Sequence, residues 1–144
     1  MPFPFTVRFS DGWGDITDEV ESIDPPWTLA KLDGVGALQF SVATYNDGQA
    51  PDPSPEILLS MLRDFASSHG LGDLGDIVTE QAELRIAAAS FRLGDDFIRV
   101  WYASDGRNFA KATYTCVWGV HQTELPDCER MIKTLRMENG KRQG

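Results

Sequence analysis

The sequence has few of the side chains that most often perform chemistry or hold metals. It contains 2 cysteines and 2 histidines among 144 residues. Two thiols do not make a disulfide framework, and no second cysteine pair completes a zinc site. Cys116 falls inside a strand pattern and Cys128 on the apolar stripe of a predicted helix. We therefore expect both to be buried free thiols, and we predict no metal and no cofactor.

Long apolar runs are also missing. No stretch approaches the roughly 20 apolar residues that span a bilayer. Residues 1–5 lack the basic region of a secretory signal, and an acidic turn follows by Asp11. The sequence therefore predicts a cytoplasmic protein with no membrane partner.

Basic residues are scarce in the first half of the chain. Residues 1–80 hold 14 acidic against 3 basic side chains (−11), and residues 81–144 hold 8 against 10 (+2), within a net charge of −9. An acidic surface repels nucleic acids, whose binding depends on cationic contacts that release counterions. The same surface would attract a basic protein partner by electrostatic steering. The simpler alternative is that this charge only keeps the protein soluble.

What is present is the pattern of one folded domain, with 42% hydrophobic and 24% charged residues. Three strand-like stretches at residues 84–93, 97–102 and 108–118 are separated by short turns rich in Gly, Asp and Ser, which predicts an antiparallel meander. We expect a single domain over residues 1–137 and a frayed tail at 138–144.

Upstream of the meander, residues 27–32 and 37–45 alternate around Asp33-Gly34, which is typical of a hairpin. A short strand is expected at residues 6–9, and an irregular acidic segment at 10–24.

Two amphipathic helices complete the predicted fold. Ser54 can cap the first, Pro55 suits its first position, and Gly70 is a natural stop. The second apolar stripe runs from Leu125 to Leu135. The order strands, helix, strands, helix predicts an α+β fold, a single antiparallel β-sheet meander flanked by two main α-helices.

Two literal motifs have structural interpretations. Residues 70–75 match G-x-G-x-x-G, but they follow a helix instead of joining a strand to a helix, so we interpret them as a helix stop and a loop. Cys116 and His121 are five residues apart and invite a nucleophile-and-base hypothesis for a hydrolase. A catalytic thiol needs an exposed electropositive site, which a strand position between Tyr114 and Trp118 disfavours. The sequence therefore predicts that the protein is not an enzyme.

The acidic N-terminal segment is the best candidate binding surface. Its spacing does not establish the convergence that a metal site or an acid–base pair requires. Trp13, between two glycines, either folds back onto the sheet or is exposed as a contact anchor, since Trp is enriched at binding hot spots. The candidate partner-binding residues are Trp13, Asp15, Asp18, Glu19 and Glu21.

An alternative site is an apolar pocket for a small molecule between sheet and helix. Its lining would be Phe65, Trp101 and Tyr114. Core packing is the simpler explanation of the same aromatic residues.

Several segments resemble the closing sheet-and-helix half of PsbP-like (Mog-type) proteins over residues 84–137. The resemblance is carried by Arg99-Val100-Trp101-Tyr102, Asp105-Gly106-Arg107-Asn108, Ala112-Thr113-Tyr114-Thr115-Cys116, Glu129-Arg130-Met131-Ile132 and Leu135-Arg136. It implies the α+β fold of that group and no catalytic residues. Residues 36–41, Gly-Ala-Leu-Gln-Phe-Ser, are similar to small bacterial toxin-immunity proteins.

Together these patterns favour a noncatalytic protein-binding module. We expect a bacterial immunity or adaptor protein, monomeric or homodimeric, that docks a basic partner through its acidic N-terminal half. A small-molecule-binding domain is the alternative.

Overall fold

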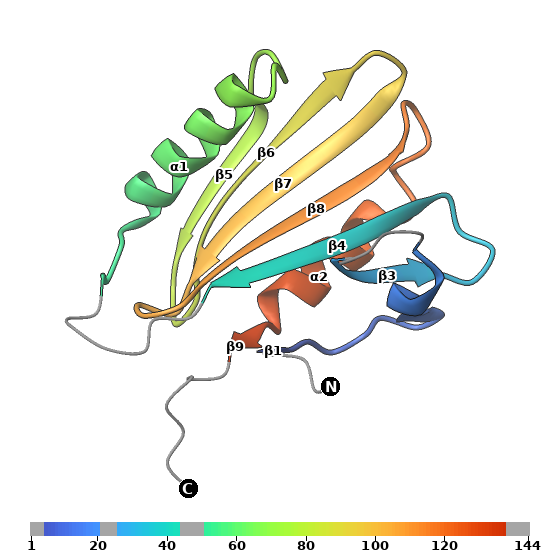
Figure 1. Ribbon diagram of the computed structural model, residues 1–144, viewed down its shortest axis with the longest axis horizontal. Helices are drawn as coiled ribbons and strands as arrows, with labels where there is room; N and C mark the ends of the chain where they lie inside the picture. Colours follow the sequence, from blue (N-terminus) through green and yellow to red (C-terminus); the bar gives the residue numbers. More distant parts are fainter. Residues whose placement is uncertain (1–4, 21–25, 44–50, 138–144) are drawn as a thin grey trace, which may run out of the picture.

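A computed structural model describes residues 5–20, 26–43 and 51–137. It has two α-helices and a mainly antiparallel sheet, so the α+β class is confirmed (Figure 1). The elements are β1 (Phe5–Thr6), β2 (Trp13–Asp15), η1 (Thr17–Glu19), β3 (Trp27–Lys31), β4 (Gly36–Ala43), α1 (Pro55–Ser68), β5 (Gly75–Gln81), β6 (Arg85–Leu93), β7 (Asp96–Ser104), β8 (Phe109–Val117), α2 (Leu125–Lys133) and β9 (Arg136–Met137). Among the described residues, no helix is long and apolar enough to cross a bilayer.

Seven strands form the main sheet in the order β2-β3-β4-β8-β7-β6-β5, and every neighbouring pair is antiparallel. The predicted meander is present as β6, β7 and β8. The predicted hairpin, β3 and β4, joins it through eight β4–β8 pairs that run from Gly36↔Cys116 to Ala43↔Phe109. The N-terminal strands therefore extend the same sheet.

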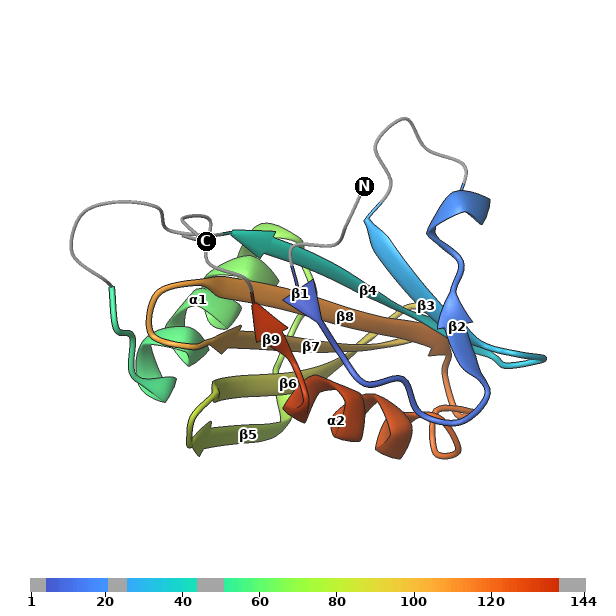
Figure 2. The ribbon, with the colours of Figure 1, turned by 90° about the horizontal axis from the view of Figure 1, so that it is seen from below.

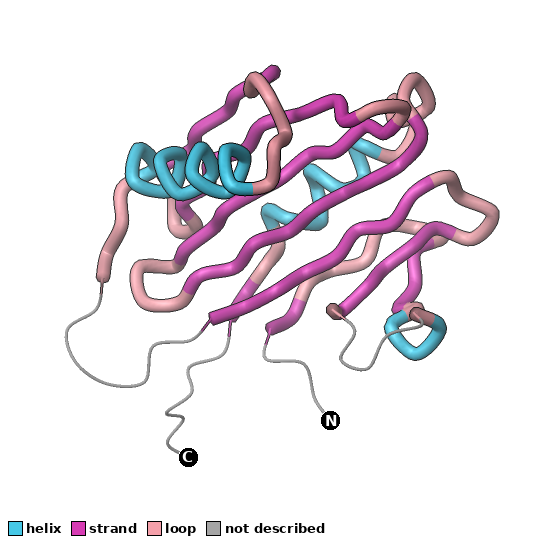
Figure 3. The backbone as a smooth tube through the Cα atoms, turned by 45° about the horizontal axis from the view of Figure 1, so that its top comes forward, coloured by secondary structure: helices cyan, strands magenta, loops and turns pink. Residues whose placement is uncertain are grey.

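Alternation along the strands gives the sheet two different faces. Val100 on β7 packs with residues of α1, and the next residue, Trp101, packs with residues of α2. Ala89 and Ala88 on β6 divide in the same way. α1 covers β5, β6 and β7, whereas α2 lies with β1 and β9 (Figures 2 and 3).

Local sequence signals account for α1. The Ser54 side chain accepts a hydrogen bond from Ile57 N at 3.3 Å, and Pro55 occupies the first turn, as predicted. The helix ends before Gly70, whose φ of +64° places it in the left-handed region that favours glycine.

The structure differs from the predicted elements at three places, where pairing with strands distant in the sequence decided the structure. The loop expected over residues 70–75 is present up to residue 74, and it leads into the edge strand β5, which was not predicted and has a register shift between Gly75 and Val78. The strand expected at 6–9 is limited to β1, which pairs with β9. Within the segment expected to be irregular, β2 adds to the edge of β3. The predicted tail at 138–144 lies outside the described residues.

A buried carboxylate joins the start of α2 to the sheet. Glu124 is 2% exposed and accepts hydrogen bonds from Val35 N at 2.9 Å, Gly36 N at 3.1 Å and the Tyr114 hydroxyl at 2.9 Å. These bonds satisfy a charge that would otherwise be costly to bury. They hold the β3–β4 turn, β8 and α2 together.

Glu129 provides a second connection from α2 to the sheet. Its carboxylate accepts hydrogen bonds from Arg99 Nε at 2.8 Å and Trp101 Nε1 at 3.1 Å. Arg99 is 3% exposed and also donates to Ser90 Oγ at 2.8 Å and to the Asp76 carbonyl at 3.0 Å. One guanidinium therefore connects α2, β6, β7 and β5.

We predict that Arg99→Ala lowers the free energy of unfolding by about 2 kcal/mol, because it removes the buried guanidinium that donates to Glu129, Ser90 and the Asp76 carbonyl. Chemical denaturation measures this. The control is Arg136→Ala, whose exposed pair with Glu83 spans 3.8 Å and whose loss should cost about 0.5 kcal/mol or less. Equal effects of the two substitutions would contradict this account.

Candidate functional site

The two cysteines are buried free thiols, as predicted. Burial raises the pKa of the Cys116 thiol and the pKa of the Cys128 thiol above their ordinary values. The His121 ring stacks on Phe97, with the ring centroids 3.7 Å apart and the planes 6° apart. Neither thiol therefore has the lowered pKa that activates a cysteine nucleophile. Across the described ranges, no group of three or more His, Cys, Asp or Glu side chains could hold a metal ion.

The three residues proposed to line a pocket are not brought together. Phe65 lies on α1, where Lys111 Nζ sits 4.2 Å from its ring centroid and Tyr102 contacts it edge-on. Trp101 and Tyr114 belong to the core of the opposite face and are 1% and 0% exposed. The pocket prediction is wrong because the alternation of the strands separates these side chains.

Trp13 is folded back onto the sheet and is not an exposed anchor. It is 7% exposed, and its indole N–H donates to Asp127 Oδ2 of α2 at 3.0 Å. The hydrogen bond satisfies the polar end of a ring that is otherwise buried in the core.

The acidic residues around Trp13 have different environments. The Asp15 carboxylate caps the following turn, because its Oδ1 accepts from Thr17 N at 2.9 Å and from Thr17 Oγ1 at 2.6 Å. Asp18 and Glu19 are exposed on η1. Glu21 lies outside the described residues.

Exposed apolar side chains gather at one end of the sheet. Gly36 pairs with Cys116 and Asp96 pairs with both Leu93 and Val117, so the β3–β4 turn, the β6–β7 turn and the end of β8 lie at the same end (Figure 1). The exposed residues of these three connections, named here the apolar end, are Leu32, Val35, Leu93, Val117, Trp118 and Val120. They are six of the ten large apolar side chains that are exposed in the described part of the chain.

Trp118 is the largest member of the apolar end and is held in position. Its backbone N–H donates to the Asp95 carbonyl at 2.8 Å. The Arg92 guanidinium lies 4.5 Å from its ring centroid, and the Phe97 ring lies 6.0 Å away. An exposed aromatic ring in a fixed orientation loses little conformational entropy when it binds.

Exposed carboxylates lie in the same turns as members of the apolar end. Asp33 on the β3–β4 turn and Asp95 and Asp96 on the β6–β7 turn are all exposed. Arg92 is the exposed cation beside them. The turns of the apolar end therefore carry exposed apolar side chains together with more carboxylates than cations.

Sequence patterns did not identify this site. A signal was present, because Tyr114 and Cys116 point inward and so place Val117 outward. Periodicity alone does not tell whether another element covers an outward residue, so the exposure of Val117 needed the structure.

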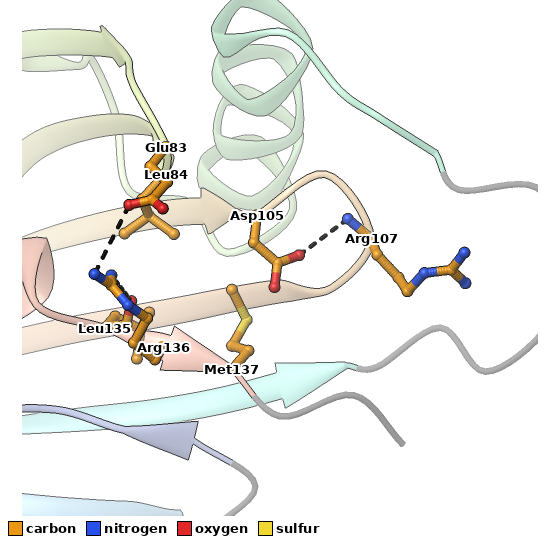
Figure 4. A pocket seen from close by; sticks show the side chains of 7 residues that line it. All are labelled: Glu83, Leu84, Asp105, Arg107, Leu135, Arg136 and Met137. Carbon is orange, nitrogen blue, oxygen red and sulfur yellow. Dashed lines mark hydrogen bonds and ion pairs between the residues drawn. The ribbon is translucent and has the colours of Figure 1, made fainter. Parts of the chain in front are cut away.

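A hollow of about 370 Å³ lies at the other end of the sheet, around the β5–β6 and β7–β8 turns (Figure 4). Leu84, Leu135 and Met137 contribute apolar surface there. Arg136 donates to the Leu135 carbonyl at 3.3 Å and pairs with Glu83 at 3.8 Å, whereas the Arg107 side chain points away from the others. The polar groups of this hollow do not converge on a common point.

We predict that native Cys116 and Cys128 react with Ellman's reagent far more slowly than the unfolded chain, because burial raises the pKa of each thiol and only the thiolate reacts. The folded state holds the thiol protons more tightly. This contribution to stability is therefore complete below the unfolded pKa of roughly 8.5 and is lost as pH rises above it.

Thiol titration with and without guanidinium measures the first effect, and denaturation midpoints between about pH 7 and pH 10 measure the second. Cys116→Ala and Cys128→Ala separate the two sites. Rapid labelling of the native protein at neutral pH would contradict the prediction.

The similarity of this chain to known proteins is a similarity of fold. No family model matches the chain, and no curated protein matches it in sequence. The solution structure of cyanobacterial PsbP (CyanoP) from Synechocystis sp. PCC 6803 is similar, with a TM-score of 0.60 and 8% identity over 93% of this chain and 86% of that one. A crystal structure from Bacteroides thetaiotaomicron VPI-5482 has a TM-score of 0.59 and 14% identity, and covers 98% of this chain.

The chain spans about half the length of the Bacteroides protein, 47%. At such low identities, structural similarity shows the fold and nothing about activity. The fold is therefore PsbP-like, which agrees with the resemblance noted over residues 84–137.

Proposed function

We propose that this chain is a noncatalytic protein-binding module, of the adaptor or toxin-immunity type, that binds a basic partner protein. The observation that carries the proposal is the apolar end of the sheet. Large apolar side chains that stay exposed together at one end of a sheet are typical of a binding surface. Trp118 supplies the kind of rigid aromatic residue that dominates interface energetics.

The distribution of charge supports a basic partner. Asp33, Asp95 and Asp96 are exposed at the turns of the apolar end, and residues 1–80 carry a formal charge of −11. Carboxylates at an interface rim accelerate encounter with an oppositely charged partner more than they strengthen the final complex. The acidic N-terminal half would therefore steer the partner, while the apolar end provides the contact.

Asp18 and Glu19 fit the steering role. Both are exposed on η1, beyond the end of β2 that follows Trp13. The β3–β4 turn is at the opposite end of β3, since Trp13 pairs with Lys31 and Asp15 pairs with Leu29. These two carboxylates therefore act on the partner at a distance and not as members of the apolar end.

We predict that Trp118→Ala weakens binding of the partner by about 30-fold or more, as expected for a hot-spot residue worth roughly 2 kcal/mol. The test captures partners from the native lysate on immobilised wild-type protein and measures dissociation constants with the variants. Ile57→Ala is the control, because Ile57 is an exposed apolar residue on α1, 52% exposed against 41% for Trp118. Retention of the partner by Trp118→Ala, or equal loss with Ile57→Ala, would overturn the proposal.

We predict that the double substitution Asp18→Lys and Glu19→Lys slows association and flattens its salt dependence, with little change in the dissociation rate. Surface plasmon resonance at several ionic strengths measures both rates. Glu56→Lys with Asp64→Lys on α1 changes the net charge by the same amount and is the control. A change confined to dissociation would show that the acidic residues are contacts and do not steer.

A further inference from the structure

A groove of about 660 Å³ lies between residues 8–11 and the side of α2. Figure 2 shows the connection from β1 to β2 running beside this helix. Arg8, Lys31, Arg130 and Lys133 line the groove, and we refer to it as the cationic groove. It shares none of its lining residues with the apolar end.

Positive charge is in excess in the cationic groove. Its carboxylates are Asp11 and Asp127, against four cations. Asp127 is already engaged, because its Oδ2 accepts from Trp13 Nε1 at 3.0 Å and lies 3.8 Å from Lys31 Nζ, while its Oδ1 pairs with Arg130. The Asp127 carboxylate is therefore shared between Lys31, Arg130 and an indole, so it does not fully neutralise the charge of either cation.

The Arg8 side chain adds an unneutralised charge. Its backbone N–H donates to Thr134 Oγ1 at 2.8 Å, but across residues 5–20, 26–43 and 51–137 its guanidinium forms no hydrogen bond or ion pair. Lys133 pairs with Glu80 at 3.2 Å and remains 57% exposed in its side chain. A local excess of cations on a chain of net charge −9 indicates an affinity for anions at this place.

The walls of the cationic groove are fixed to each other. Thr134 Oγ1 accepts from Arg8 N and donates to the Met131 carbonyl at 2.7 Å. Ser10 Oγ donates to the Asp127 carbonyl at 3.4 Å. The cations are therefore presented on a preformed frame, which lowers the entropy cost of binding.

We propose that the cationic groove binds a small organic phosphate. Arg8 and Arg130 supply planar guanidinium groups, which bind phosphate oxygens in pairs. Phe9 lines the same groove and is exposed, so it offers an apolar contact for the organic part. The volume is that of a small-molecule site, and the acidity of the rest of the chain opposes a long polyanion such as a nucleic acid.

The test is isothermal titration of the full chain with phenyl phosphate at low salt. We expect one site per chain, and about tenfold weaker binding when Arg8→Gln and Arg130→Gln are combined, because two charged contacts of roughly half a decade each are lost. Arg63→Gln with Arg92→Gln removes the same charge from exposed arginines outside the groove and should change the affinity by about twofold or less. Equal weakening in both variants would show nonspecific attraction and overturn the proposal.

Two further measurements test whether the ligand is a phosphate and whether it binds in the cationic groove. Citrate, a carboxylate anion, should bind more weakly than phenyl phosphate, and equal or tighter binding would overturn the choice of phosphate. In amide NMR spectra of the wild-type protein, phenyl phosphate should shift the signals of Arg8, Phe9 and Thr134. Shifts located elsewhere, or no heat in the titration, would also overturn the proposal even if a variant failed to fold.

Discussion

Three carboxylates hold this fold together: Glu124 immediately precedes α2, and Asp127 and Glu129 lie within it. Glu124 binds the β3–β4 turn and β8, Asp127 binds the indole of Trp13 on β2, and Glu129 binds Arg99 and the indole of β7. A buried or half-buried carboxylate is tolerated only where donors satisfy it, so each one fixes the position of the strand that supplies those donors. One short helix of nine residues thereby sets the relative positions of four strands.

The opposite face of the sheet is organised differently. α1 rests there on apolar contacts of Leu62 and Ala66 with Ala89, Phe91 and Val100. Apolar packing tolerates small displacements better than a network of directed hydrogen bonds, because its strength depends on area more than on angle. The α2 face combines directed hydrogen bonds with an apolar core of its own, whereas the contacts of α1 with the sheet are apolar.

The sequence predicted those parts of the structure that depend on neighbours along the chain. Ser54 and Pro55 start α1 because capping acts over three residues, and the turns of the meander act over two to four. Trp13 remained ambiguous because its partner, Asp127, is 114 residues away. β5 was missed for the same reason, since its pairing with β6 outweighed the glycines of the preceding loop. The apolar end required knowledge of what covers each outward residue.

The register shift in β5 has a consequence for how this sheet ends. β5 is an edge strand, and Ile77 and Val78 are both exposed beside the shift. A flat apolar edge invites a strand from another molecule to continue the sheet. The shift breaks the regular spacing of outward N–H and C=O groups, and Asp76, with a φ of +46°, bends the backbone at the same point. An incoming strand would find its row of hydrogen-bond partners interrupted at this point, which disfavours continuation of the sheet along the whole of β5.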